Sequence, residues 1–167
     1  MTRKPNRMYR KIEGQVYTRT EYMGGIPTVR VTQFDSGNLK AEFPVALTLH
    51  AEEAAQVRDI ALEAARVKAV RILELNAPNE FRLKVRRFPH AILREHKMAM
   101  GAGADRISDG MRGAFGKPVG HAVRTQIGEP VVTVYTIEKH IETAKSALRG
   151  AAHKIPVPTR LVITRAN

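Results

Sequence analysis

Residues 81–88, Phe-Arg-Leu-Lys-Val-Arg-Arg-Phe, alternate large apolar and basic side chains over their first six positions. Successive side chains of a β-strand point to opposite faces, so the two kinds of side chain would separate. The apolar members are Phe81, Leu83 and Val85, and the basic members are Arg82, Lys84 and Arg86. The pattern predicts a strand with one face on a core and a row of cations on the other face. Arg87 and Phe88 break the alternation, and Pro89 interrupts the strand.

Two helices are predicted around this strand. Residues 51–75 are rich in Ala, Leu, Glu and Arg, which are good helix formers, with Glu52 and Glu53 in the first turn. Their apolar stripe at helical spacing consists of Val57, Ile60, Ala64 and Val67. A second stripe begins at Ile137 and ends at Leu148. Thr136 would cap that helix and Gly150 would end it.

Further short strands are predicted at residues 28–34, 43–49, 92–94 and 161–163, with a turn at 35–38. Residues 119–127 and 131–137 predict a hairpin around Gly128. Because most of these strands follow one another without a crossover helix, we expect antiparallel or mixed pairing. The sequence therefore predicts a two-layer α+β fold with two helices, as a single domain over residues 1–167.

Length and composition restrict the class of protein. The chain has 167 residues, 43% of them hydrophobic, which is enough to bury a core. It contains no apolar run of the roughly 20 residues that span a bilayer, and its basic start does not resemble an export signal. The chain has no cysteine, which excludes disulfides and thiolate metal sites. The absence of cysteine is neutral about the compartment, and a cytoplasmic protein is expected because no export signal is seen.

Net charge is the most informative global number. The 28 Lys and Arg residues outnumber the 16 acids, which gives a formal net charge of +12. A field of this sign attracts polyanions, and nucleic acid is the commonest of them. An anionic membrane is the alternative, but it usually needs a basic amphipathic helix with large apolar anchors, and Trp is absent. We expect a nucleic-acid partner and no membrane.

Cations gather in two further places. Residues 1–11 form a basic arm without an acid before Glu13, and Pro5 favours an extended arm that becomes ordered on RNA. A frayed terminus is the alternative. The row of the 81–88 strand also continues through His90, Arg94, His96 and Lys97. A solvated sheet face normally mixes signs, but Glu80 and Glu95 only flank the row Arg82, Lys84 and Arg86 and no acid lies inside it, so this row favours RNA binding.

A glycine-rich loop is predicted at residues 98–118. Gly101, Gly103, Gly110, Gly113 and Gly116 keep its backbone mobile and permit close approach to a ligand. Arg106, Arg112 and Lys117 add charge, and three methionines could fit irregular surfaces. Loops of this length are functional or disordered.

Signals for an enzyme are weak. Gly101-Ala102-Gly103 lacks the third glycine of a dinucleotide site, and Ser108 has no evident base. Asp105 and Asp109 lack the further oxygen ligands of a metal site, and the six histidines lack metal-binding spacing. We expect no catalytic residue, metal, cofactor or small-molecule substrate. A free RNA-binding regulator or chaperone remains open, since it would share the arm and the basic strand.

Several segments together resemble a known family. They are Asn6–Arg10, Arg87–His90, Arg94–Met98, Gly101–Arg106 and Gly110–Pro118. They are similar to the universal L-sixteen family of large-subunit ribosomal proteins, in its archaeal and eukaryotic branch, L-ten-e. The resemblance covers nearly the whole chain. The chain lacks the C-terminal extension of eukaryotic members, which indicates an archaeal-type member. His121 departs from the family pattern, where a small residue or threonine is expected.

The resemblance implies an α/β-hammerhead type fold bound to 23S rRNA near the central protuberance and the 5S rRNA region. It implies contacts with A-site and P-site tRNA, neighbouring large-subunit proteins and late assembly factors, and a loop directed at the peptidyl transferase centre. The residues expected on rRNA are Arg3, Lys4, Arg7, Tyr9, Arg10, Lys11, Arg82, Lys84, Arg86, Arg87, His90, Arg94, His96 and Lys97. Those expected to face tRNA are Met100, Gly101, Ala102, Gly103, Ala104, Asp105, Arg106, Gly110, Met111, Arg112, Gly113, Phe115 and Lys117.

Overall fold

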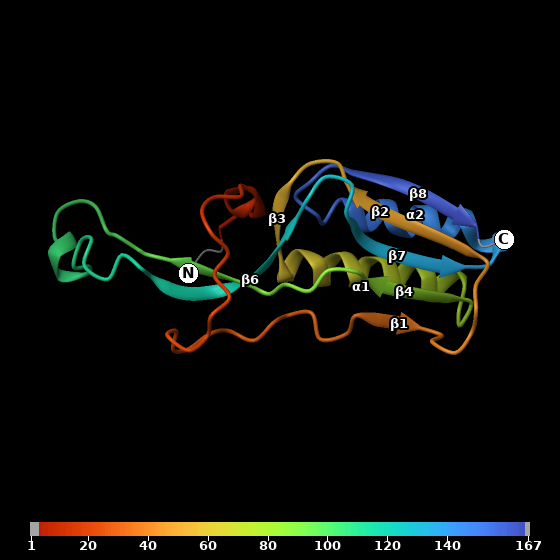
Figure 1. The fold of residues 1–167 in the computed structure, drawn as a ribbon, viewed down its shortest axis with the longest axis horizontal. Coiled ribbons are helices and arrows are strands. Elements are labelled where there is room, and N and C mark those ends of the chain that lie inside the picture. The colour runs from red at the N-terminus through yellow and green to blue at the C-terminus, as the bar shows by residue number, and fades with distance from the viewer. Residues whose placement is uncertain (1–3, 166–167) are drawn as a thin grey trace.

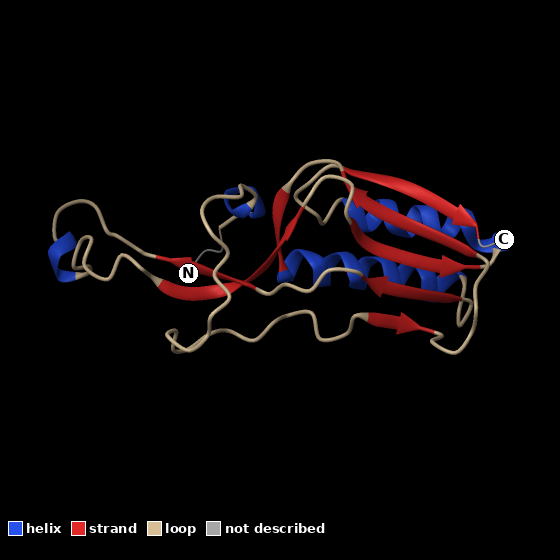
Figure 2. Cartoon of the chain, viewed as in Figure 1, coloured by secondary structure: helices blue, strands red, loops and turns tan. Residues whose placement is uncertain are grey.

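The computed structural model describes residues 4–165, so Arg3 lies outside the described residues. Within them, eight strands, two α-helices and three short 3-10 helices follow one another along the chain (Figures 1 and 2). The strands are β1 (Asp35–Gly37), β2 (Val45–Ala51), β3 (Ala55–Arg58), β4 (Phe81–Val85), β5 (Ala91–Glu95), β6 (Lys117–Thr125), β7 (Pro130–Thr136) and β8 (Thr159–Arg165). The helices are α1 (Asp59–Asn76) and α2 (Ile141–Ala152), with 3-10 turns η1 (Asn6–Tyr9), η2 (Ala104–Arg106) and η3 (Glu138–His140).

A five-stranded sheet carries the core. Its order is β1-β4-β7-β2-β8, and every neighbouring pair is antiparallel. β2 alternates buried and half-buried residues along its length, which is the pattern of a sheet with one covered face. α1 and α2 lie together on that covered face (Figure 2). The largest side chains buried there include Leu47, Leu62, Leu73, Leu83 and Leu148.

A three-stranded antiparallel sheet, in the order β3-β6-β5, extends from the body. The segment of residues 96–116, here called the finger, joins β5 to β6 and lies at the end of the molecule away from the C-terminus (Figure 1). The second sheet therefore carries the glycine-rich segment outward from the core. The predicted α+β architecture with two helices and antiparallel pairing is confirmed, and so is the placement of Phe81, Leu83 and Val85 on the core.

The predicted start of the first helix is wrong. α1 begins at Asp59, not at residue 51, because residues 55–58 form β3 and pair with β6. The predicted stripe is also wrong, since Val67 is 49% exposed. The face that packs on the body instead contains Ala61, Leu62, Ala65, Ala69 and Leu73. The long-range pairing of residues 55–58 with β6 overrides their local helix propensity.

The predicted strand at residues 28–34 and the turn at 35–38 are also wrong. The chain has no strand at 28–34, and β1 occupies Asp35–Gly37. Gly37 has a φ of +91°, and a Cβ there would lie 2.4 Å from the carbonyl oxygen of Phe81. Glycine therefore lets this short edge strand lie against β4.

The predicted hairpin over residues 119–137 does not form. β6 and β7 belong to different sheets, and the turn at Gly128 carries the chain from one sheet to the other. Both predicted limits of the second helix are wrong as well. The hydroxyl of Thr136 donates to the carbonyl oxygen of Glu80, and Gly150 lies inside α2, where a Cβ would meet Lys68 and Ile72 of α1 at 3.3–3.4 Å.

Candidate nucleic-acid interface

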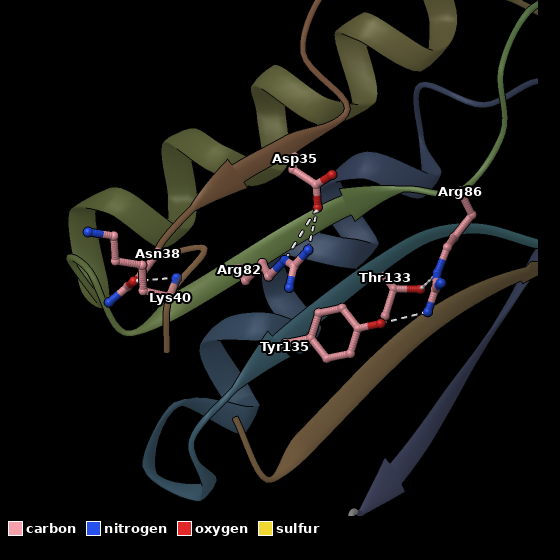
Figure 3. Close-up of polar contacts among 7 residues, drawn as sticks. All are labelled: Asp35, Asn38, Lys40, Arg82, Arg86, Thr133 and Tyr135. Carbon is pink, nitrogen blue, oxygen red and sulfur yellow. Dashed lines mark hydrogen bonds and ion pairs between the residues drawn. The ribbon is translucent and has the colours of Figure 1, made fainter. Parts of the chain in front are cut away.

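The face of the five-stranded sheet that the helices leave uncovered, here called the open face, carries the predicted cations of β4. The pairing register places Arg82 beside Tyr135 of β7, and Tyr135 beside Ala46 of β2. In the next row, Lys84 lies beside Thr133, and Thr133 beside Thr48. These rows of the open face are polar and basic, and Figure 3 shows the part around β4 and β7.

The sequence suggested that Arg82 is an unpaired cation, but the structure shows that it forms an ion pair. Its Nη2 and Nε lie 3.1 Å and 3.3 Å from Oδ1 of Asp35, which β1 brings alongside β4 (Figure 3). No acid lies within the 81–88 stretch itself, but the neighbouring strand supplies one. Because both side chains are about one-third exposed, the pair neutralises charge without contributing much stability.

Arg86 and Lys84 form no ion pair among residues 4–165, although Asp35, which pairs with Arg82, lies opposite Lys84 in the register of β1 with β4. Arg86 donates from Nε to Thr133 Oγ1 at 3.1 Å and from Nη2 to the hydroxyl of Tyr135 at 2.6 Å, and both partners are neutral (Figure 3). Lys84 has no hydrogen-bond or ion-pair partner among residues 4–165. An oriented guanidinium beside an unpaired ammonium on an exposed sheet is suited to binding phosphate groups.

The rest of the predicted cation row does not continue this surface. Arg87 pairs with Glu129 at 2.7 Å, and His90 contacts the carbonyl oxygen of Phe88 at 3.2 Å. Arg94 and His96 belong to the root of the finger. β4 and β5 lie in different sheets, so the row is divided between the body and the finger.

Arg94 connects the finger to the N-terminal segment. Its guanidinium carbon lies 4.2 Å from the ring centre of Tyr17 and 3.8 Å from that of Phe115, and Nη1 donates to the carbonyl oxygen of Phe115 at 2.9 Å. Gly116, with a φ of +75°, leaves no room for a side chain, since a Cβ would lie 2.7 Å from the carbonyl carbon of Glu95. These contacts fix the direction in which the finger leaves β5 and β6.

The finger itself is held by few contacts. His96 Nε2 lies 2.7 Å from the carbonyl oxygen of Gly110, and the amide of Ala99 donates to Ser108 Oγ at 3.2 Å. Met100, Ile107 and Met111 are exposed by 86%, 80% and 68%. Arg106 and Arg112, predicted as loop cations, have no side-chain partner among the described residues. The finger thus offers apolar and cationic groups to a partner.

The basic arm is folded back on the body, which corrects the prediction of an extended arm without acidic neighbours. Residues 6–9 form η1, and the amide of Gln56 donates to the carbonyl oxygen of Arg10 at 2.8 Å. Lys4 pairs with Glu95 at 2.5 Å, Arg10 pairs with Glu53, and Lys11 pairs with Glu13 at 2.6 Å. The hydrogen bond from Lys4 is the largest cause that lowers the pKa of Glu95 and, reciprocally, raises that of Lys4.

Three arginines that the sequence analysis did not single out lie near the arm and the second sheet. Arg30 lies where a strand was predicted, and Arg58 lies in a segment predicted as helix. Arg124 donates to the carbonyl oxygens of Gly14 and Glu13 at 2.9 Å and 3.1 Å and so fixes the N-terminal segment on β6. The ring nitrogen Nε2 of His121 lies 2.8 Å from the carbonyl oxygen of Pro27.

Among residues 4–165, no group of three or more His, Cys, Asp or Glu side chains is placed to hold a metal ion. No helix in the same range is long and apolar enough to cross a membrane.

These features define a class: a basic α+β protein with two antiparallel sheets, a partly uncompensated cationic sheet face and a projecting glycine-rich finger. The family model for ribosomal protein L16p/L10e matches residues 12–162, and the chain belongs to that family. The resemblance stated from the sequence motifs is therefore confirmed.

Archaeal relatives agree with this assignment over nearly their full length. The chain is 55% identical to large ribosomal subunit protein uL16 of Archaeoglobus fulgidus, across 100% of this chain and 96% of the relative. It is 54% identical to the protein of that name from Methanocella arvoryzae, across 99% and 96%. It is 51% identical to that from Thermoplasma acidophilum, across 100% and 96%.

Proposed function

We propose that this chain, a structural constituent of the large ribosomal subunit, binds 23S rRNA through its open face and its basic arm. The proposed location is near the central protuberance and the 5S rRNA region. The finger is proposed to point toward the peptidyl transferase centre and to support the positioning of tRNA in the A site, beside the P site. Neighbouring large-subunit proteins and late assembly factors are the further proposed partners.

The observation that carries this proposal is the presence on the open face of two cations, Lys84 and Arg86, that form no ion pair among residues 4–165. Arg86 is oriented by two neutral hydroxyls, and Lys84 is unpaired within residues 4–165. Consecutive outward side chains on a strand are about 7 Å apart, which is comparable to the spacing of phosphates along an RNA strand. Phosphate contacts of this kind fix the position of a protein on RNA.

The docked arm and the finger add to this support. The arm places Arg7 on the surface with no partner among the described residues, and Tyr9 beside Arg58. On the finger, the large exposed apolar side chains suit irregular RNA surfaces, and the glycines allow the backbone to approach closely.

The test compares variants of cations that form no ion pair with variants of cations that pair with an acid. Lys84→Ala/Arg86→Ala should weaken incorporation into large subunits and flatten the dependence of log affinity on log salt by roughly 0.7–0.9 per lost phosphate contact. Arg82→Ala should have a smaller effect, because Asp35 already neutralises Arg82. Lys145→Ala, on the helix side and paired with Glu142, is the control. A double variant that matches the control at every salt concentration would contradict the proposal.

A free RNA-binding regulator or chaperone is the competing function. It would also depend on Lys84 and Arg86, so the salt experiment does not separate the two. Co-sedimentation separates them. A constituent of the subunit stays with large subunits at moderate salt, whereas a free factor dissociates.

A further inference from the structure

A cavity of about 510 Å³ lies between the basic arm, the junction of β3 with α1, and the strands β5 and β6. Lys4 and Tyr9 line it from the arm, Arg58 from the junction and Gly120 from β6. We call it the arm pocket. Its volume falls within the roughly 300–1,000 Å³ range of small-ligand sites in proteins. It is separate from the open face, because it is lined by the second sheet and the arm.

The arm pocket is positively charged. Its four cations, Lys4, Arg30, Arg58 and Lys97, face two carboxylates, those of Asp59 and Glu95, which leaves a net charge of about +2. Both carboxylates are engaged. Asp59 is buried and accepts hydrogen bonds from the backbone amides of Arg30 at 3.0 Å and Ile60 at 2.8 Å, while Glu95 pairs with Lys4.

One wall of the arm pocket is a stacked pair of flat groups. The guanidinium carbon of Arg58 lies 4.5 Å from the ring centre of Tyr9, and Nη1 of Arg58 donates to the carbonyl oxygen of Lys4 at 3.3 Å. Gln56 Nε2 donates to the carbonyl oxygen of Tyr9 at 3.1 Å and holds the arm in place. Splayed bases of RNA stack on aromatic rings and on arginine planes, so this wall matches a nucleobase.

We propose that the arm pocket takes one nucleotide turned out of the rRNA, with its base against the Arg58–Tyr9 pair and its phosphate on the cations. This inference rests on the proposed binding of rRNA and names a subsite for it. An acidic peptide would satisfy the charge but would leave the flat wall without a planar partner. The guanidinium of Arg30 has no partner among residues 4–165 and is available to the phosphate.

Gly120 offers a way to fill the arm pocket without changing its charge. A Cβ at Gly120 would meet no atom within 4 Å, and its φ is ordinary, so a side chain there is accommodated. Gly120→Gln would then occupy space that the nucleotide needs. Gly24 has the same open surroundings and an ordinary φ but does not line the pocket, so Gly24→Gln is the matched control.

The experiment uses the full chain and two fluorescein-labelled RNA probes of equal charge: hexauridylate and an abasic hexamer with the same backbone. At about 0.15 M salt, the unsubstituted chain should bind hexauridylate roughly tenfold more tightly than the abasic probe, because base stacking adds to phosphate binding. Gly120→Gln should reduce this ratio to about one to twofold, and Gly24→Gln should leave it unchanged. Arg58→Lys, which keeps the charge but loses the flat group, should also reduce the ratio.

Equal binding of the two probes by the unsubstituted chain would overturn the arm-pocket proposal. The proposal would also be overturned if the folded variants Gly120→Gln and Arg58→Lys both kept the tenfold preference for hexauridylate over the abasic probe. Circular dichroism establishes that each variant is folded. The open-face variant Lys84→Ala/Arg86→Ala should lower affinity for both probes and preserve their ratio. A double variant without effect, beside a ratio lost in Gly120→Gln, would contradict the open-face proposal and leave the arm pocket standing.

Discussion

The five-stranded body and the finger are stabilised in different ways. In the body, Leu47, Leu83 and Leu148 are completely buried between the sheet and the two helices. In the finger, Met100 and Ile107 are more than three-quarters exposed, and shape depends on glycine conformations and single hydrogen bonds. Burial makes the body rigid, while the finger is fixed mainly at its root. Substitutions should therefore change global stability in the body and local order in the finger.

The largest expected contrast is between two apolar truncations. Leu83→Ala removes a fully buried side chain from β4 and should lower the free energy of unfolding by about 2–5 kcal/mol. Met111→Ala removes a side chain that is 68% exposed and should change it by less than about 0.5 kcal/mol. Urea unfolding followed by circular dichroism measures both. Similar losses for the two variants would mean that the finger belongs to the cooperative core.

Two glycines sharpen the comparison. Gly37→Ala places a Cβ 2.4 Å from the carbonyl oxygen of Phe81 and should separate β1 from β4, at a cost of about 1–3 kcal/mol of global stability. Gly116→Ala meets the backbone of Glu95 at 2.7 Å and should instead increase hydrogen exchange of residues 96–116 while the urea midpoint stays unchanged. A midpoint that falls as far in Gly116→Ala as in Gly37→Ala would remove the distinction.

The smallest expected effect is the pH dependence of arm docking. Glu95 has a lowered pKa, first because Lys4 hydrogen-bonds its carboxylate, so docking should weaken as the pH falls through that lowered value. Lys4 has a raised pKa, first because of its hydrogen bond to Glu95, so docking should also weaken as the pH rises through the raised value. Amide chemical shifts of residues 4–11 report both limits. Lys4→Gln should remove the high-pH limit and weaken the low-pH limit, because Lys97 and Tyr9 also lower the pKa of Glu95. An unchanged profile in that variant would assign both limits to other groups.

The sequence was sufficient where local patterns decide structure. The alternation in residues 81–85 predicted β4 and its buried face correctly, because strand side chains must alternate. The beginning of α1 could not be found in this way. Ala55 pairs with Thr125, which is 70 positions away in the sequence, and the composition of residues 51–58 does not indicate this pairing. β1 was missed for the same reason, since its three residues have the composition of a turn.

The sequence was sufficient to predict which basic residues point outward at the candidate interface, but not which of them are neutralised by an acid. The sequence identified Arg82, Lys84 and Arg86 as outward cations, which the structure confirms. It could not show that Asp35 neutralises Arg82, because that acid comes from another strand. The arm pocket could not be predicted from the sequence either, because Arg58 and Tyr9 come into contact only when the arm folds back onto β3.

Replacing Gly101 to Gly113 with a short glycine-serine linker is the most direct measurement of whether the body and the finger act separately. The body should keep its urea midpoint, and the variant chain should sediment with large subunits at moderate salt. Translation by those subunits should fall, since the finger is missing from the proposed tRNA path. A chain that unfolds, or that no longer joins the subunit, would show that the finger is part of the body's own stability or binding surface.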